Sequence, residues 1–119
     1  MDTRRAFGNR GEARAAEFLE RKGFAVIERQ FRTEFGEIDL VCKDAAGWIV
    51  FVEVKTRKSL TSGHPEESVT QAKLKHLEAT GEEWLRVHVL ERAAHRYDVV
   101  AITESVEGEV LDILHLEGV

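Results

Sequence analysis

Two neighbouring segments of this chain place charged side chains where the strands of a folded sheet normally carry apolar ones. The first segment is Gly36–Val41 and the second is Phe51–Arg57. Both are rich in β-branched and aromatic residues and alternate with a period of two, so each is predicted to be a strand. The face of the second strand that carries Phe51 also carries Glu53 and Lys55. This face therefore changes from apolar to charged along the strand.

The charges on these two strands favour a bound cation. Glu37 and Asp39 share one face of the first strand. If the strands are neighbours, these two carboxylates and that of Glu53 meet the single ammonium of Lys55 at the end of a buried sheet. Two unit negative charges about 4 Å apart repel by roughly 4 kcal/mol at an effective dielectric constant near 20. Because Lys55 alone does not balance that repulsion, we expect a further cation there.

The length and composition are those of one globular domain over residues 1–119. No repeat, low-complexity tract or linker divides the sequence. Hydrophobic residues make up 43% of the chain and charged residues 33%, which argues against general disorder. No apolar run approaches the ~20 residues that span a bilayer, and the N-terminus leads into a polar helix instead of a signal-peptide core. We therefore expect a soluble, cytoplasmic protein with no membrane partner.

Cysteine and charge content narrow the functional classes. The single cysteine, Cys42, excludes an internal disulfide and a cysteine-based zinc site. The net charge of −5 argues against broad nucleic-acid affinity, which depends on Lys and Arg displacing counterions. Residues 1–32 nevertheless carry a net charge of +3, and residues 77–119 carry −7. The basic N-terminal part is compatible with a polyanionic substrate, although a merely solvated helix face would have the same charge.

The pattern along the chain predicts elements in the order αβββαββ, a mixed sheet covered by helices in an α/β fold. The expected elements are a helix over Gly8–Lys22, a strand over Phe24–Arg32, the two charged strands, a helix from Thr70 towards Leu85, and strands over Arg96–Ile102 and Val110–Leu116. Thr70 is the expected N-cap of the second helix. Gly81 weakens that helix in its interior, where a break is compatible with the sequence.

Two further expectations concern the loops and the core. The polar segment Ser59–Pro65 follows the charged strand directly and is predicted to be a mobile substrate loop. Trp48 and Trp84 are predicted to pack in or near the core.

Asp39 and Glu53 are the candidate ligands of a hard divalent ion such as Mg²⁺ or Mn²⁺. Mg²⁺ prefers oxygen ligands and keeps several waters, so one or two carboxylates and a substrate phosphate make a sufficient site. The backbone carbonyl of Val54 could supply a third oxygen. An ion held there would lower the pKa of a bound water, and Lys55 could orient that water or offset charge in the transition state. The reaction indicated is metal-assisted hydrolysis of a phosphodiester.

Other charged residues have two readings each. Arg57, Lys58 and Lys73 would suit contacts to phosphates, which add affinity without sequence information, or are ordinary surface charges. Glu12 reaches the site only if the first helix packs beside the strand ends, and is otherwise a solvated residue near the positive end of its helix. Glu37 either helps the site or is solvated beside the turn.

A set of short motifs runs through nearly the whole chain: Gly11-Glu12 with Ala16 and Leu19, Gly23-Phe24, Gly36–Leu40, Phe51–Arg57, Ser68–Thr70 with Lys73 and Leu77, and Arg96–Val100. With these motifs the sequence resembles the YraN-like family of the restriction-endonuclease-like, or PD-(D/E)xK, nuclease superfamily. The resemblance implies a fold related to archaeal Holliday-junction resolvases. It also implies a metal-dependent active site containing Asp39, Glu53 and Lys55, with Glu12 as an accessory acidic residue.

The sequence departs from the superfamily pattern at two places. Ile38 stands where many members have proline before the aspartate. Leu74 follows Lys73 where many members carry Lys-Gln, and the nearby glutamine, Gln71, is displaced. The second departure puts a water-orienting or phosphate-contacting glutamine on this helix in doubt.

Two functions follow as hypotheses. The first is a Mg²⁺- or Mn²⁺-dependent endonuclease that hydrolyses DNA, with branched or repair and recombination intermediates as candidate substrates. The alternative is a non-catalytic nucleic-acid- or protein-binding module that retains the nuclease fold. Because 119 residues leave little surface to grip a DNA junction, a homodimer or a partner protein is a further expectation.

Overall fold

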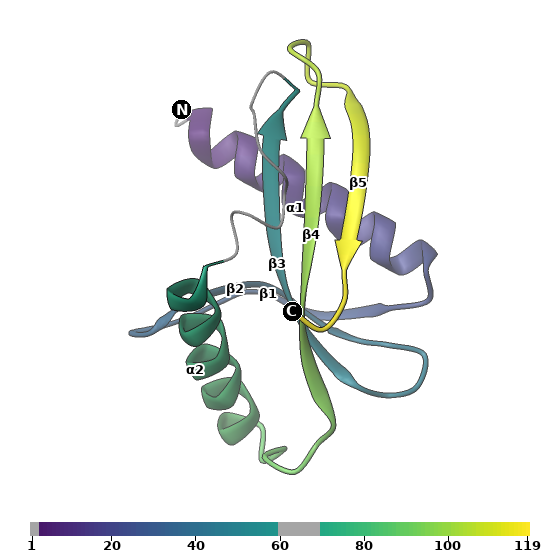
Figure 1. Cartoon of the computed structure of the whole chain (residues 1–119). Coiled ribbons are helices and arrows are strands. Elements are labelled where there is room, and N and C mark those ends of the chain that lie inside the picture. Colours follow the sequence, from purple (N-terminus) through teal and green to yellow (C-terminus); the bar gives the residue numbers. More distant parts are fainter. Residues whose placement is uncertain (1–2, 60–69) are drawn as a thin grey trace.

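The computed structural model describes residues 3–59 and 70–119, so the predicted substrate loop lies, apart from Ser59, outside the described residues. The elements are α1 (Thr3–Arg21), β1 (Ala25–Thr33), β2 (Gly36–Lys43), β3 (Ile49–Lys58), α2 (Gln71–Val87), β4 (His95–Glu104) and β5 (Val110–Leu116) (Figure 1). The predicted order αβββαββ is confirmed. None of the helices in the described ranges is long and apolar enough to cross a membrane.

The strands form one mixed sheet in the order β1-β2-β3-β4-β5. β3 and β4 run parallel, whereas the other neighbouring strands run antiparallel. Parallel neighbours need a long crossover connection, and α2 lies in the crossover between β3 and β4. The hairpin of β1 and β2 closes at the pair Thr33–Gly36, which leaves a two-residue turn.

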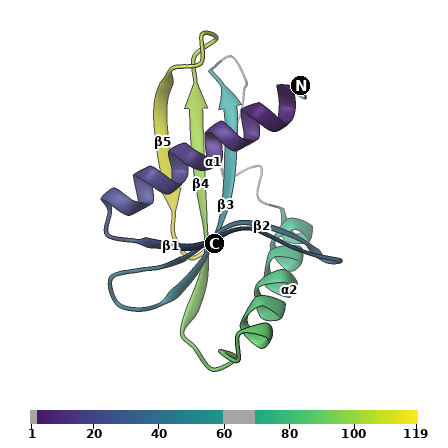
Figure 2. The ribbon, with the colours of Figure 1, turned by 180° about the vertical axis from the view of Figure 1, so that it is seen from behind.

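The two helices cover opposite faces of the sheet (Figures 1 and 2). Each face has its own cluster of buried apolar side chains. The α1 cluster joins Ala15, Ala16 and Leu19 to Leu40, Cys42, Val50, Val52, Val100 and Ile102. The α2 cluster joins Leu77, Trp84 and Leu85 to Ile38, Val41, Ile49 and Phe51. Burying a large apolar side chain contributes roughly 1.5–3 kcal/mol, so these two clusters hold both helices on the sheet.

Details of α2 confirm its expected N-cap and answer the question that the sequence left open at Gly81. The Thr70 side chain accepts a hydrogen bond from the backbone N–H of Lys73 at 3.1 Å, as expected of an N-cap. The helix continues unbroken through Gly81. A Cβ at this position would lie 2.6 Å from the hydroxyl oxygen of Tyr97, so the glycine permits close packing of α2 on the sheet instead of ending the helix.

The expectations for the tryptophans are half right. Trp84 is buried, and its indole N–H donates to a carboxylate oxygen of Glu28 at 2.9 Å. Trp48 is 42% exposed, so the prediction of a core position is wrong for it. It stands in the turn between β2 and β3, where the backbone N–H of Trp48 donates to the Asp44 side chain.

Candidate active site

Strands β2 and β3 part at the candidate site. Their ladder ends at the pair Leu40–Val52, and Asp39 and Glu53 are the next residues on the two strands. β3 continues beyond this point, paired with β4 on its other side as far as Lys58. The backbone N–H of Val54 donates to Oδ2 of Asp39 at 2.7 Å. Since a backbone N–H needs an acceptor, the Asp39 carboxylate takes the place of the missing strand partner and is fixed in the fork.

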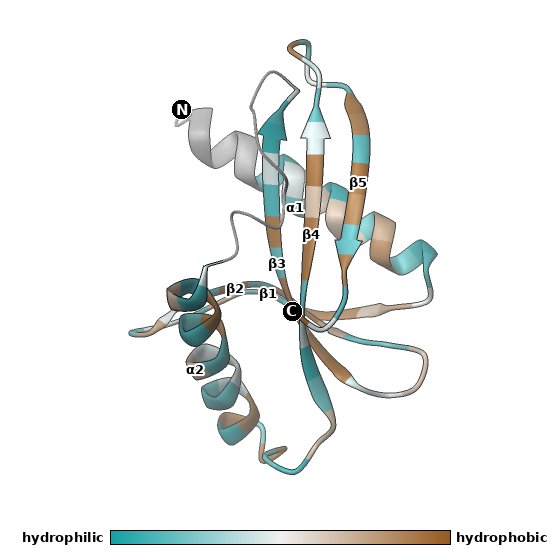
Figure 3. Ribbon diagram, in the orientation of Figure 1, coloured by the Kyte–Doolittle hydropathy of each residue, from teal (hydrophilic) through white to brown (hydrophobic). Residues whose placement is uncertain are grey.

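Glu53 and Lys55 lie two residues apart on β3, so their side chains share a face. Nζ of Lys55 lies 3.3 Å from Oε1 of Glu53. β3 changes from apolar residues in its first half to polar ones in its second half (Figure 3). The structure therefore confirms the change along the strand and brings the predicted carboxylates and lysine together at the fork.

Asp39 is in an environment that disfavours its charge. The pKa of this carboxyl group is raised to about 7, mainly by burial and against the lowering effect of the Val54 hydrogen bond. The negative charges of Glu53, Glu37 and Glu12 contribute to the rise. A carboxylate whose ionisation is opposed both by burial and by neighbouring acids favours a bound cation.

Lys73 reaches the same site from the first turn of α2. Burial lowers the pKa of Lys73 below its ordinary value, and the contact with the Lys55 side chain and its charge lower the pKa further. Burial also acts to lower the pKa of Lys55, but its contacts with Lys73 and Glu53 outweigh that effect and raise it. The two lysines are therefore in contact at the site, and each acts on the pKa of the other.

Glu12 approaches the site from α1. Glu12 is 8% exposed. Its Oε2 atom accepts a hydrogen bond of 3.0 Å from the side-chain amide of Gln30 on β1. Glu12 is also one of the charges that raise the pKa of Asp39. The sequence left open whether the first helix packs beside the strand ends. Gly11 of α1 lies directly against Thr56 of β3, so the helix does pack there and brings Glu12 towards the fork.

Glu37 lies at the edge of the cluster. Its carboxylate is 3.2 Å from Nε of Arg32, its partner across the hairpin. The charge of Glu37 still raises the pKa of Asp39. Since Arg32 already balances it, Glu37 is better placed to tune the site than to bind a ligand.

Arg57 and Lys58 lie farther along β3. Nε of Arg57 is 3.5 Å from Oγ1 of Thr103, at the limit of a hydrogen bond. Nζ of Lys58 lies 2.9 Å from Oε1 of Glu104. The fully buried side chain of Glu104 also pairs with Arg10 at 3.1 Å and with Arg14. Of the three predicted phosphate-binding residues, Lys73 is the one that the structure places beside Lys55.

Gln30 is a member of the site that the sequence patterns did not identify. The hairpin pairs Arg29 with Leu40 and Phe31 with Ile38, so Gln30 lies opposite Asp39. Counting back from the two-residue turn could have found this position. The backbone at Gln30 has a φ of 56°. This left-handed conformation costs roughly 1–2 kcal/mol for a residue other than glycine. No sequence pattern indicated this conformation.

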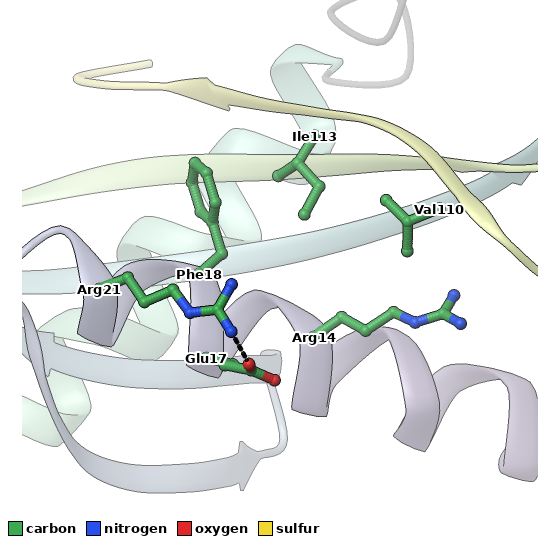
Figure 4. A pocket seen from close by; sticks show the side chains of 6 residues that line it. All are labelled: Arg14, Glu17, Phe18, Arg21, Val110 and Ile113. Carbon is green, nitrogen blue, oxygen red and sulfur yellow. Dashed lines mark hydrogen bonds and ion pairs between the residues drawn. The ribbon is translucent and has the colours of Figure 1, made fainter.

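A pocket of 270 Å³ lies on another part of the surface, between α1 and β5 (Figure 4). Its walls are Arg14, Glu17, Phe18, Arg21, Val110 and Ile113. The Glu17 carboxylate and the Arg21 guanidinium form an ion pair at its edge. None of the carboxylates or lysines at the fork lines this pocket, so the two features are separate.

The donor atoms at the fork suit a hard divalent ion. Within residues 3–59 and 70–119, no group of three or more His, Cys, Asp or Glu side chains is arranged to hold a metal by itself. Asp39 and Glu53 offer two carboxylates, and Mg²⁺ typically uses one or two together with waters and substrate phosphate. The residues present therefore fit such an ion.

Comparison with known proteins identifies the family. The model of "Uncharacterised protein family UPF0102" matches residues 11–102. A "UPF0102 protein" of Caldicellulosiruptor saccharolyticus is 42% identical over 110 residues, which cover 92% of each chain. Relatives with the same name from Arthrobacter sp. strain FB24 and Beutenbergia cavernae are 42% and 43% identical over 119 residues, which cover all of this chain and 99% of theirs.

Fold and site together define a small mixed α/β domain with a carboxylate and lysine cluster at a fork between two strands. The chain belongs to the UPF0102 family.

Proposed function

We propose that this protein is a Mg²⁺- or Mn²⁺-dependent endonuclease that hydrolyses phosphodiester bonds of DNA. The observation that carries the proposal is the convergence of Asp39, Glu53 and Lys55 where β2 and β3 part. The resemblance to the YraN-like family of the PD-(D/E)xK superfamily supports the same chemistry. Branched DNA and intermediates of repair or recombination are the candidate substrates.

Each residue has a role in this proposal. Asp39 and Glu53 would hold the divalent ion, with the carbonyl of Val54 as a further oxygen. The ion would supply Lewis acidity and would lower the pKa of a bound water. Lys55, which pairs with Glu53, would orient the attacking water or stabilise charge on the phosphoryl oxygens. Lys73, which contacts Lys55, is the candidate for a contact to a substrate phosphate.

The overall reaction consumes one water. The water oxygen forms a bond to phosphorus, the bond from phosphorus to one bridging oxygen breaks, and that oxygen leaves as a hydroxyl group after gaining a proton. The products are a terminal phosphate monoester and a free hydroxyl end. Glu12 and Glu37 contribute negative charge around Asp39, which favours binding of the cation that the reaction needs.

The test is cleavage of labelled DNA. The purified protein is incubated with Mg²⁺ or Mn²⁺ and single-stranded, duplex, flapped and four-way substrates, alongside Glu53→Gln and Lys55→Met. Glu83→Gln serves as a matched control, because Glu83 forms an exposed pair with Arg86 of the same helix. Metal-dependent cleavage that both site variants lose and the control keeps is expected. Cleavage of no substrate would contradict the proposal.

The dependence of DNA affinity on salt concentration tests the alternative function, a non-catalytic binding module. If the protein bound DNA without cutting it, the logarithm of its affinity would fall with the logarithm of salt concentration, with a slope of about −0.9 per phosphate contacted on duplex DNA. Binding with no salt dependence would indicate a protein partner. Sedimentation in the presence and absence of DNA would show whether a homodimer forms.

A further inference from the structure

Gln30 has a backbone conformation that is unusual for the interior of a strand. Its φ of 56° lies in the left-handed region, where non-glycine residues are uncommon and where Asn, Asp and His are enriched. Strained residues persist where the surrounding structure holds them in place, and they cluster at active sites. The contacts of this side chain therefore indicate what the strain maintains.

Both N–H donors of the Gln30 amide are directed to α1. Nε2 lies 3.0 Å from Oε2 of Glu12 and 3.3 Å from Oδ1 of Asn9. Asn9 and Glu12 are three residues apart and so are neighbours on one face of the helix. An amide NH₂ group has two donors, and here each has an acceptor on α1. These two bonds fix the orientation of the amide and link β1 to the helix.

The position of the Glu12 carboxylate depends on its hydrogen bond with Gln30. Among the residues that the structure describes, the hydrogen bond from Gln30 is the one that the Glu12 carboxylate accepts, and Glu12 is 8% exposed. A buried carboxylate without a donor is costly. If the Gln30 amide were removed, the Glu12 carboxylate would be more stable turned towards solvent. The negative charge of Glu12 would then lie farther from Asp39, on which it acts in the folded protein.

We propose that Gln30 is a positioning residue that holds the Glu12 carboxylate beside Asp39 and so strengthens the binding of a divalent cation by the cluster. This inference rests on the proposed function, because it assumes that Asp39 and Glu53 hold that cation. Gln30 acts through Glu12 in this account and touches neither the substrate nor the reacting atoms.

The first test is Mn²⁺ affinity measured by titration calorimetry on the full chain. Gln30→Gly relaxes the backbone and removes the amide, and we expect the affinity to fall about tenfold, the lower end of the range for residues that orient metal ligands. The matched control is Val89→Gly. Val89 also has a φ of 56° but is 81% exposed beyond the end of α2, so its variant relieves the same strain and should bind Mn²⁺ as the wild type does.

A double-mutant cycle tests whether Gln30 acts through Glu12. In the Glu12→Gln background, Gln30→Gly should cause no further loss of Mn²⁺ affinity. Gln30→Met keeps the length of the side chain and removes its donors, and it should lose as much affinity as Gln30→Gly. This second variant keeps the test decisive if the glycine variant folds poorly, and thermal melting of each protein reports the fold.

Three results would overturn the inference, and they are distinguishable. Wild-type affinity in both Gln30 variants, with Asp39→Asn losing binding, would refute the role of Gln30 alone. Additive losses from Gln30→Gly and Glu12→Gln would also refute it, since the two residues would then act independently. If no variant and no wild-type protein bound Mn²⁺, the proposed function would fail together with this inference.

Discussion

Asp39 carries an unfavourable charge in the folded protein, and this has a consequence for stability. The pKa of Asp39 is about 7 in the fold, above its ordinary value near 3.8. Between these two values the folded state binds a proton that the unfolded state lacks. The free energy of unfolding therefore decreases as pH rises from about 4 to about 7.

Asp39→Asn should remove this effect. Without divalent metal, we expect the variant to melt at a higher temperature than the wild type at pH 8 and to show a flatter pH profile between pH 4 and pH 8. Asp112→Asn is the control, because Asp112 is an exposed residue of β5. Melting curves in a chelator test the prediction, and a variant less stable than the wild type at pH 8 would contradict it.

A variant of Lys55 tests whether catalysis and metal binding depend on different residues. Replacing it with methionine removes a positive charge next to Glu53, so Mn²⁺ should bind at least as tightly as in the wild type. Cleavage should fall by about 10²–10³-fold, the cost of losing one group that stabilises transition-state charge. Calorimetry and single-turnover cleavage on the same preparation measure both quantities. Equal losses in both would instead make Lys55 a structural residue.

The sequence predicted the charged residues at the fork better than it predicted the residues that contact them. Asp39, Glu53 and Lys55 were found because charged residues are conspicuous in apolar strands with a period of two. Gln30 was missed because its polar side chain in an amphipathic hairpin strand is ordinary and its left-handed backbone leaves no mark in the sequence. The proximity of Lys73 to Lys55 arises from the docking of α2, which depends on tertiary packing.

Among the elements, α1 is the one whose position decides whether Glu12 joins the site. Gly11 packs directly against β3, and a Cβ built on it would overlap Oγ1 of Thr56 but lie 3.5 Å from the Thr56 Cβ. The absence of a side chain at Gly11 therefore lets the helix approach the strand that carries Glu53 and Lys55.

Gly11→Ala should destabilise the protein, even though alanine is more favourable than glycine in a helix by about 1 kcal/mol. We expect a loss of about 1–3 kcal/mol in the free energy of unfolding, the usual cost of overpacking. In a Thr56→Ala background the obstructing oxygen is gone, and the same substitution should cost nothing. Urea denaturation of the four proteins completes the cycle, and an equal loss in both backgrounds would contradict this account of the packing.

The order of elements was predictable because alternation, helical spacing and glycines at turns all agreed along the chain. The sequence was less informative where packing overrides local preference. Gly81 weakens a helix in isolation, yet here it accommodates the ring of Tyr97. Ile38 and Leu40 are two residues apart but pack in different clusters, so the regular alternation of β2 is interrupted next to Asp39.

On the scale of the whole molecule, a cluster of ion pairs around one buried carboxylate joins the first helix to the last part of the sheet. Glu104 at the end of β4 is fully buried among Arg10 and Arg14 of α1 and Lys58 of β3. Burial alone would raise the pKa of Glu104, but the hydrogen bonds and charges of Arg10 and Lys58 outweigh it and lower the pKa to about 2. The ionised carboxylate therefore stabilises the fold.

Glu104→Gln should lower the free energy of unfolding at pH 7 by about 1.5–3 kcal/mol, as for other hydrogen bonds to charged groups. Because the pKa is lowered, this stabilisation is complete above the ordinary value of 4.5 and is lost as pH falls towards about 2. The difference between variant and wild type should therefore shrink in acid. Glu83→Gln, at an exposed pair, should show no measurable loss in the same denaturation series.

The central claim is that the carboxylates where β2 and β3 part bind a divalent cation. Titration calorimetry with Mn²⁺ at pH 8, where Asp39 is ionised in most molecules because its pKa is about 7, tests it most directly. We predict saturable binding by the wild type and by Glu83→Gln, with binding lost in Asp39→Asn and Glu53→Gln. Binding that is absent from the wild type, or unchanged in both site variants, would contradict the account.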